Sequence, residues 1–175
     1  MKYELVILDR DGVINFPAPD GEYVFTKKSF VLYDDVKIFI KELLNHKIKV
    51  AIASNQRGIA LNIYSREDVE SLHQIFLNAC GLGDADVRLF YCPHNIDECE
   101  CRKPKPGLLI ESLTTLNVKA SRAVFIGDKE SDGDAARALA IDFMKLTRGI
   151  HSPKKNEFDS LTACLPDLLG NYDVK

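Results

Sequence analysis

Short, mostly apolar runs, several of which end at polar residues, constrain the fold of this chain more than any other feature. The runs occupy residues 5–8, 48–53, 87–91, 123–126 and 143–146. Between them lie segments with helical spacing of apolar residues, at 36–44 after Asp34, from Ser65 to 76, at 107–116 and at 134–140. Strands that alternate with helices in this way pair in parallel. We therefore expect an α/β fold with a doubly wound, mostly parallel sheet.

Length and charge narrow the class of protein. The 175 residues, 46% of them apolar, suit a single domain over residues 1–175. The net charge of −3 and the lack of a basic run argue against nucleic-acid partners. No apolar stretch reaches the roughly 20 residues of a membrane span, and Glu4 and Asp9 interrupt any signal peptide. We expect a cytoplasmic monomer with no membrane partner.

Polar residues follow three of the apolar runs where each run stops. These residues are Asp9, Ser54 and Asp128. The carboxyl ends of parallel strands meet at one edge of a sheet, and ligands bind beyond that edge. We therefore expect the three side chains to converge on one site. The long loop over residues 15–28 should lie beside it.

Pairs of carboxylates stand at two of these strand ends. Asp9 and Asp11 point to the same side of an extended backbone. They repel each other unless a cation lies between them, and Mg²⁺ prefers such oxygen ligands. Asp128 and Asp132 add two more carboxylates four residues apart. Taken alone, each pair is also compatible with a simple turn or a helix cap.

The segment Ser54-Asn55-Gln56-Arg57-Gly58 offers a hydroxyl, two carboxamides and backbone N–H groups directly after a strand. Such a turn can cradle phosphate oxygens. An ordinary polar turn is the alternative for this segment when it is considered alone.

Three of the five cysteines, with one histidine, lie within ten residues. They are Cys92, His94, Cys99 and Cys101. In a cytosolic chain this cluster indicates a metal rather than disulfides. Three thiolates and an imidazole form the ligand set of a closed, structural Zn²⁺ site, which we place in a small loop at residues 92–101. The alternative is a group of reduced surface residues.

The motifs together resemble the haloacid dehalogenase-like phosphatases, over about residues 5–147. Asp9-x-Asp11-Gly12, Ser54-Asn55, Lys103 and Gly127-Asp128-x-x-x-Asp132 stand in the order found in that superfamily. The strings LDRDGVIN, SNQRGIA, CPH and CECRKPKPG look like the subgroup that contains heptose 1,7-bisphosphate phosphatases and related histidinol-phosphate phosphatases.

The resemblance implies a role for each motif residue. Asp9 would be the nucleophile and Asp11 the general acid and base. Mg²⁺ would be held by Asp9, Asp11 (through its backbone carbonyl) and Asp128, with Asp132 behind them. Ser54 and Lys103 would hold the phosphoryl oxygens. Substrate contacts would come from Asn55, Gln56, Arg102 and Lys129. The zinc ligands are those named above, so the cofactors expected are Mg²⁺ and Zn²⁺.

The expected substrate is a small phosphorylated metabolite. The resemblance favours hydrolysis of the 7-phosphate of D-glycero-D-manno-heptose 1,7-bisphosphate, in carbohydrate metabolism that supplies lipopolysaccharide. A histidinol-phosphate phosphatase is the alternative within the subgroup. A zinc-stabilised binding module without activity is the alternative from another class, although Asp9 and Asp11 are both present. A nucleic-acid end-processing phosphatase is disfavoured by the acidic net charge.

Overall fold

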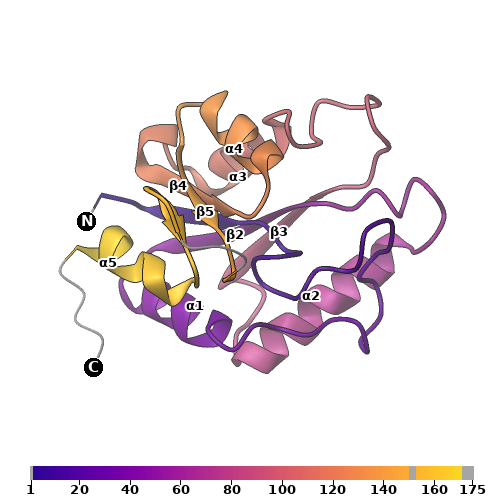
Figure 1. Cartoon of the computed structure of the whole chain (residues 1–175), viewed down its shortest axis with the longest axis horizontal. Coiled ribbons are helices and arrows are strands. Elements are labelled where there is room, and N and C mark those ends of the chain that lie inside the picture. The colour runs from indigo at the N-terminus through magenta and orange to yellow at the C-terminus, as the bar shows by residue number, and fades with distance from the viewer. Residues whose placement is uncertain (1, 150–152, 171–175) are drawn as a thin grey trace.

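The computed structural model describes residues 2–149 and 153–170, and six strands in one sheet form its centre (Figure 1). Every strand pair is parallel, and the strand order is β3-β2-β1-β4-β5-β6. The strands are β1 (Leu5–Leu8), β2 (Lys49–Asn55), β3 (Val87–Cys92), β4 (Ala123–Gly127), β5 (Asp142–Leu146) and β6 (Glu157–Phe158). The expected parallel sheet is confirmed.

Helices cover both faces of the sheet. In Figure 1, α1 (Val36–Asn45), α2 (Arg66–Cys80) and α5 (Leu165–Leu169) lie on one face, and α3 (Gly107–Leu116) and α4 (Glu130–Arg137) lie on the other. Alternate residues of β1 pack into the hydrophobic cores on the two faces of the sheet. Val6 and Leu8 belong to the core with α1 and α2, whereas Leu5 and Ile7 belong to the core with α3 and α4. Burial on both faces explains why β1 is apolar throughout.

Strand β1 lies at the point where the chain reverses its direction of winding. It pairs with β2 on one side and with β4 on the other, so that Leu8 stands opposite both Ile52 and Ile126. The residues that follow β1 and β4 therefore emerge side by side, and ligand sites form at such a switch point.

Local signals set the helix boundaries, with two corrections to the sequence prediction. The capping box of α2 is present, with Asp68 N donating to Ser65 Oγ at 3.2 Å. The predicted cap at Asp34 is wrong, because Asp35 takes that position and its carboxylate binds Arg148 instead.

Helix α4 begins at Glu130 rather than at residue 134 and ends before Ala140, whose φ is 53°. The acidic first turn, which favours a helix start, accounts for the earlier beginning. The two-residue strand β6 was not predicted. Within the described residues no helix is both long and apolar enough to cross a lipid bilayer.

Candidate active site

Three aspartates from separate segments meet beyond the carboxyl ends of β1 and β4. They are Asp9, Asp128 and Asp132, and one carboxylate oxygen from each lies within 4.8 Å of the others. We call these three residues the acidic centre. Asp9 and Asp132 are buried, and the Asp9 backbone N–H donates to the Ile126 carbonyl at 3.0 Å. The strand register thus brings Asp9 and Asp128 together, as predicted, and adds Asp132.

Lys103 lies inside the acidic centre. Its Nζ is 2.7 Å from Asp9 Oδ1 and 2.7 Å from Asp132 Oδ1, and the residue is only 4% exposed. Burial opposes the charge of this ammonium, but the carboxylates of Asp9 and Asp132 outweigh burial and raise the pKa of Lys103. The lysine therefore stays charged and fixes one oxygen of Asp9.

Asp128 carries an unsatisfied negative charge at this centre. Its Oδ1 is buried and has no hydrogen-bond partner among the described residues. Burial, and then the neighbouring Asp9, raise the pKa of Asp128 to about 7. Gly12, with φ of +93°, makes room, since a Cβ there would come within 2.3 Å of Asp128 Oδ2. Three carboxylates against one ammonium, with an unpartnered oxygen, fit a hard divalent cation such as Mg²⁺.

The carboxylate of Asp11 lies outside the acidic centre, in a cluster of donors. Arg10 Nη2 is 3.0 Å from Asp11 Oδ2, and Asn15 Nδ2 donates to Asp11 Oδ1 at 2.9 Å. The sequence suggested a cation between the side chains of Asp9 and Asp11. In the structure, the Asp11 carboxylate is instead met by the donors of Arg10 and Asn15. Arg10 and Asn15 are both buried and were missed in the sequence, although Arg10 stands between the two aspartates.

The carboxyl end of β2 and the turn after it supply the next group of polar side chains. Ser54 is 1% exposed and accepts a hydrogen bond from Gln56 Nε2 at 2.8 Å. The Asn55 amide binds the backbone of Lys103 twice, with Nδ2 donating to the carbonyl at 3.0 Å and Oδ1 accepting from the N–H at 3.1 Å. Asn55 was expected to contact substrate. In the structure its amide instead ties the segment that carries Lys103 to β2.

A cleft of about 590 Å³ opens above these residues. Six of the predicted site residues line it, namely Asp11, Asn55, Gln56, Arg102, Lys103 and Lys129. The loop over residues 17–24 forms part of its wall, as expected, and so does Ile96 of the cysteine-rich loop.

Three cations of this cleft have no acidic partner among the described residues: Arg57, Arg102 and Lys129. Arg57 was not predicted, and its Nε donates to a neutral atom, Asn95 Oδ1, at 2.7 Å. Arg102 Nη1 is buried with no hydrogen-bond partner within residues 2–149 and 153–170. Uncompensated cations in one cleft of an acidic protein suit an anionic ligand.

The cysteine-rich loop brings its four predicted ligands together. Cys92 Sγ lies 3.4 Å from Cys99 Sγ, and His94 Nδ1 lies 3.3 Å from Cys101 Sγ. A tetrahedral zinc with Zn–S bonds of about 2.3 Å needs ligand atoms about 3.5–3.8 Å apart, so the observed spacing is close to that of a filled site. Burial opposes ionisation of Cys99, but hydrogen bonds led by one from Cys101 lower its pKa to about 7.

A family model described as haloacid dehalogenase-like hydrolase matches residues 6–146. The chain belongs to this family. A haloacid dehalogenase-like relative from Campylobacter jejuni, named D-glycero-alpha-D-manno-heptose-1,7-bisphosphate 7-phosphatase, is 35% identical over 176 residues, which are 100% of this chain and 99% of the relative. A relative from Pseudomonas aeruginosa, named D-glycero-beta-D-manno-heptose-1,7-bisphosphate 7-phosphatase, is 38% identical over 141 residues. The match covers 79% of this chain and 78% of the relative.

Solved structures of the family agree with the fold. The crystal structure of D,D-heptose 1.7-bisphosphate phosphatase from B. bronchiseptica, complexed with magnesium and phosphate, superposes with a TM-score of 0.83. Its sequence is 25% identical, and the match covers 97% of this chain and 99% of that chain.

Proposed function

We propose that this protein is a Mg²⁺-dependent phosphatase that removes the 7-phosphate of D-glycero-D-manno-heptose 1,7-bisphosphate. The observation that carries the proposal is the contact of 2.7 Å between buried Lys103 and Asp9, inside a group of three carboxylates at the floor of a cationic cleft. The names of two relatives, one of which matches over the full length of the chain, support the substrate.

The first half of the reaction transfers the phosphoryl group to the protein. A carboxylate oxygen of Asp9 attacks phosphorus, and the bond from phosphorus to the sugar oxygen breaks. The departing sugar oxygen keeps the bonding electron pair and takes a proton from Asp11. Asp11 is suited to this role because it lines the cleft, where the leaving oxygen lies.

The second half releases phosphate. Asp11 takes a proton from water, the water oxygen attacks phosphorus, and the bond to Asp9 breaks. Inorganic phosphate leaves and the Asp9 carboxylate is restored. Lys103 and Ser54 hold the other phosphoryl oxygens throughout, because both are buried beside Asp9 or at the adjacent strand end.

Mg²⁺ would be held by Asp9, the backbone carbonyl of Asp11, and Asp128, with Asp132 adjoining. When bound, the ion neutralises charge on the phosphoryl group and orients it. The buried, unpartnered Asp128 Oδ1 supports this assignment.

Zn²⁺ would be held by Cys92, His94, Cys99 and Cys101 in a structural site. All four positions of a tetrahedron are then taken by the protein, so no position is left for a reacting water. The site lies immediately before Arg102 and Lys103 in the chain. A rigid base for these two cations keeps them aligned with the phosphoryl group.

The 1-phosphate and the sugar would lie in the rest of the cleft. Arg102, Lys129 and Arg57 are the cations available for the second phosphate, and Gln56 and Asn55 also line the cleft. We also propose that the chain works as a single-domain monomer in the cytoplasm, on a soluble metabolite used for lipopolysaccharide.

The test is phosphate release by purified protein with Mg²⁺. The substrates compared are both anomers of heptose 1,7-bisphosphate, histidinol phosphate and fructose 1,6-bisphosphate. We expect a preference for a heptose bisphosphate of at least about tenfold, and a loss of about 10⁴-fold or more in Asp9→Asn, because the nucleophile is removed. Asp134→Asn, at an exposed acid of α4 paired with Arg137, is the control that keeps full activity.

Preference for histidinol phosphate would replace the substrate and leave the mechanism unchanged. Absence of release from every substrate, with Mg²⁺ bound, would contradict the phosphatase assignment and favour a binding module.

A further inference from the structure

A buried tyrosine and glutamine lie directly behind the reacting groups. Tyr64 and Gln56 are 7% and 1% exposed, and the Tyr64 hydroxyl donates to Gln56 Oε1 at 2.7 Å. Tyr64 comes from the loop between β2 and α2, eight residues after Gln56. The proposed reaction assigns no step to either side chain.

The other end of the Gln56 amide faces two residues of the proposed reaction. Gln56 Nε2 donates to Ser54 Oγ at 2.8 Å and lies 3.4 Å from Asp11 Oδ2. The shorter of these contacts makes Ser54 the main partner. Because Ser54 Oγ accepts from the amide, the hydroxyl's own proton is left for an acceptor in the cleft.

The direction of this chain of hydrogen bonds is fixed by chemistry. Burial raises the pKa of Tyr64 to about 12, so its hydroxyl remains a donor at neutral pH. A flipped amide would place Gln56 Oε1 against the Asp11 carboxylate and Nε2 against the Tyr64 O–H. The first contact would set two acceptors against each other, and in the second the Tyr64 hydroxyl would accept instead of donate. The observed orientation is favoured because it lets the amide donate toward Asp11 and accept from Tyr64.

The tyrosine ring is itself held in place. It stacks on Phe25 with ring centroids 5.4 Å apart and an interplanar angle of 13°. A Cβ at Gly58 would lie 2.0 Å from the same ring, so the glycine allows the ring to sit against the turn. The hydroxyl therefore reaches Gln56 from a rigid position.

We propose that Tyr64 and Gln56 are positioning residues, which aim the Ser54 hydroxyl at a phosphoryl oxygen through the ordered chain Tyr64 to Gln56 to Ser54. The inference rests on the proposed function. It differs from the expectation that Gln56 contacts substrate, because the Gln56 side chain is buried and its amide already has partners at both ends.

The test begins with Tyr64→Phe, which removes the hydroxyl and keeps the stacked ring. We expect kcat to fall about tenfold with KM within about twofold, since a misaimed hydroxyl acts on the transition state. The loss should be equal on heptose 1,7-bisphosphate and on p-nitrophenyl phosphate, because Ser54 contacts the phosphoryl group and not the leaving group. Tyr91→Phe is the control, since its hydroxyl donates to exposed Glu70 at 3.0 Å and Tyr91 does not line the cleft.

Gln56→Glu is the second variant, in case loss of the hydroxyl perturbs folding. The carboxylate still accepts from Tyr64 but draws the Ser54 proton toward itself, so we expect a larger loss of kcat, about 10²-fold. Orthovanadate, which mimics the transferred group, should bind more weakly to both variants in the presence of Mg²⁺. Urea unfolding of Tyr64→Phe and Tyr91→Phe checks that any difference in rate is not a difference in folding.

Two outcomes would overturn the inference. A rise in KM at constant kcat would make Gln56 a substrate contact. A loss on the sugar phosphate with none on p-nitrophenyl phosphate would show that the pair acts through Asp11 rather than Ser54. Failure of the wild-type protein to hydrolyse the heptose bisphosphate would count against the proposed substrate, whereas the p-nitrophenyl phosphate and vanadate comparisons would still test the pair.

Discussion

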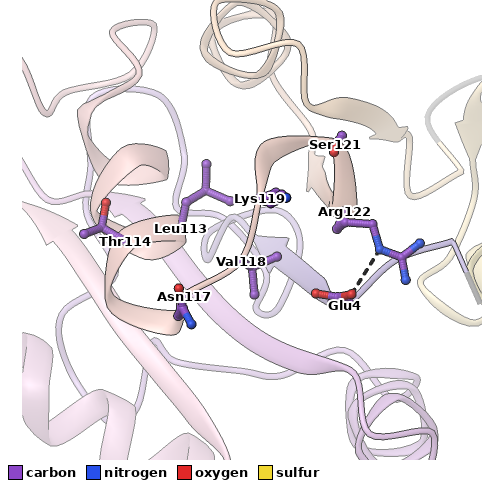
Figure 2. Close-up of a pocket in the computed structure, with 8 residues that line it drawn as sticks. All are labelled: Glu4, Leu113, Thr114, Asn117, Val118, Lys119, Ser121 and Arg122. Carbon is purple, nitrogen blue, oxygen red and sulfur yellow. Dashed lines mark hydrogen bonds and ion pairs between the residues drawn. The ribbon is translucent and has the colours of Figure 1, made fainter.

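The two ends of the sheet carry clefts of opposite character. The cleft at the amino-terminal ends of β1 and β4 is the larger, about 760 Å³ (Figure 2). Two of its three charged residues, Glu4 and Arg122, pair with each other at 3.1 Å, and their side chains are 53% and 40% exposed. The third, Lys119, is exposed to solvent. The smaller cleft at the carboxyl ends is lined by buried Lys103 and by cations that have no acidic partner among the described residues.

The comparison shows that the volume of a cleft does not by itself indicate whether the cleft binds a ligand. At the amino-terminal end the polar groups are solvated or paired, so no group there needs a ligand. At the carboxyl end, several loops bring desolvated polar atoms to one place, and such groups are costly unless a ligand or ion meets them.

The largest effect should come from Lys103→Met. It leaves Asp9 and Asp132 buried without their cation, so we expect kcat to fall by about 10³-fold and the free energy of unfolding to fall by about 3–5 kcal/mol. Steady-state kinetics and urea denaturation measure the two effects. Lys2→Met, which removes an ammonium paired with exposed Asp142, should change neither by much. Wild-type stability in Lys103→Met would contradict the buried ion pairs.

A smaller effect should follow from removing a proposed zinc ligand. Cys99→Ser should lose the bound zinc and lower kcat/KM by about tenfold, because the loop that supports Arg102 and Lys103 loosens. Elemental analysis and kinetics test this. Cys80→Ala, at a buried cysteine outside the cluster, should keep zinc. One equivalent of zinc in Cys99→Ser, or none in the wild type, would count against the site.

His73, which lies outside both clefts, should contribute to the pH dependence of the free energy of unfolding. Burial lowers the pKa of His73 below its ordinary value of about 6.5. The unfolded chain therefore binds more protons than the folded one below that pH, and the stability should fall as pH drops from about 7 toward 5. Urea denaturation at several pH values measures the free energy of unfolding as a function of pH. In His73→Gln, the part of its decrease toward pH 5 that is due to His73 should be absent. Equal slopes for the two proteins would refute the assignment.

The smallest effect is expected at the amino-terminal cleft. The double variant Glu4→Gln and Arg122→Gln removes its ion pair, and we expect unchanged kcat/KM and a loss of less than about 1 kcal/mol in unfolding free energy. The same assays apply. A fall in activity would give this cleft a role and break the contrast between the two ends.

Much of the fold and part of the site could be predicted from the sequence. Apolar runs that end in Asp9, Ser54 and Asp128 mark strands and their carboxyl ends, and the spacing of Cys92 to Cys101 marks a compact ligand group. These signals are local, because strand burial and ligand spacing leave a regular pattern in the chain.

The rest depends on contacts that leave no such pattern. Arg57 meets Asn95, and Tyr64 meets Gln56, only after the loops have packed. Asn55 could be recognised as polar and well placed, but only the tertiary structure assigns its amide to the backbone of Lys103. The start of α4 was missed because its first turn is acidic rather than apolar.

The central place of β1 has a consequence for synthesis. Its four apolar residues are made first among the strands, and β2 covers one edge some 40 residues later, whereas the other edge waits for β4 at Ala123–Gly127. An open, apolar strand edge invites pairing with another chain. The growing polypeptide therefore carries Asp9 next to an unpaired strand edge until β4 docks. Docking of β4 pairs the open edge of β1 and also brings Asp128 and Asp132 to Asp9. The acidic centre of the nascent chain is therefore incomplete until that edge is covered.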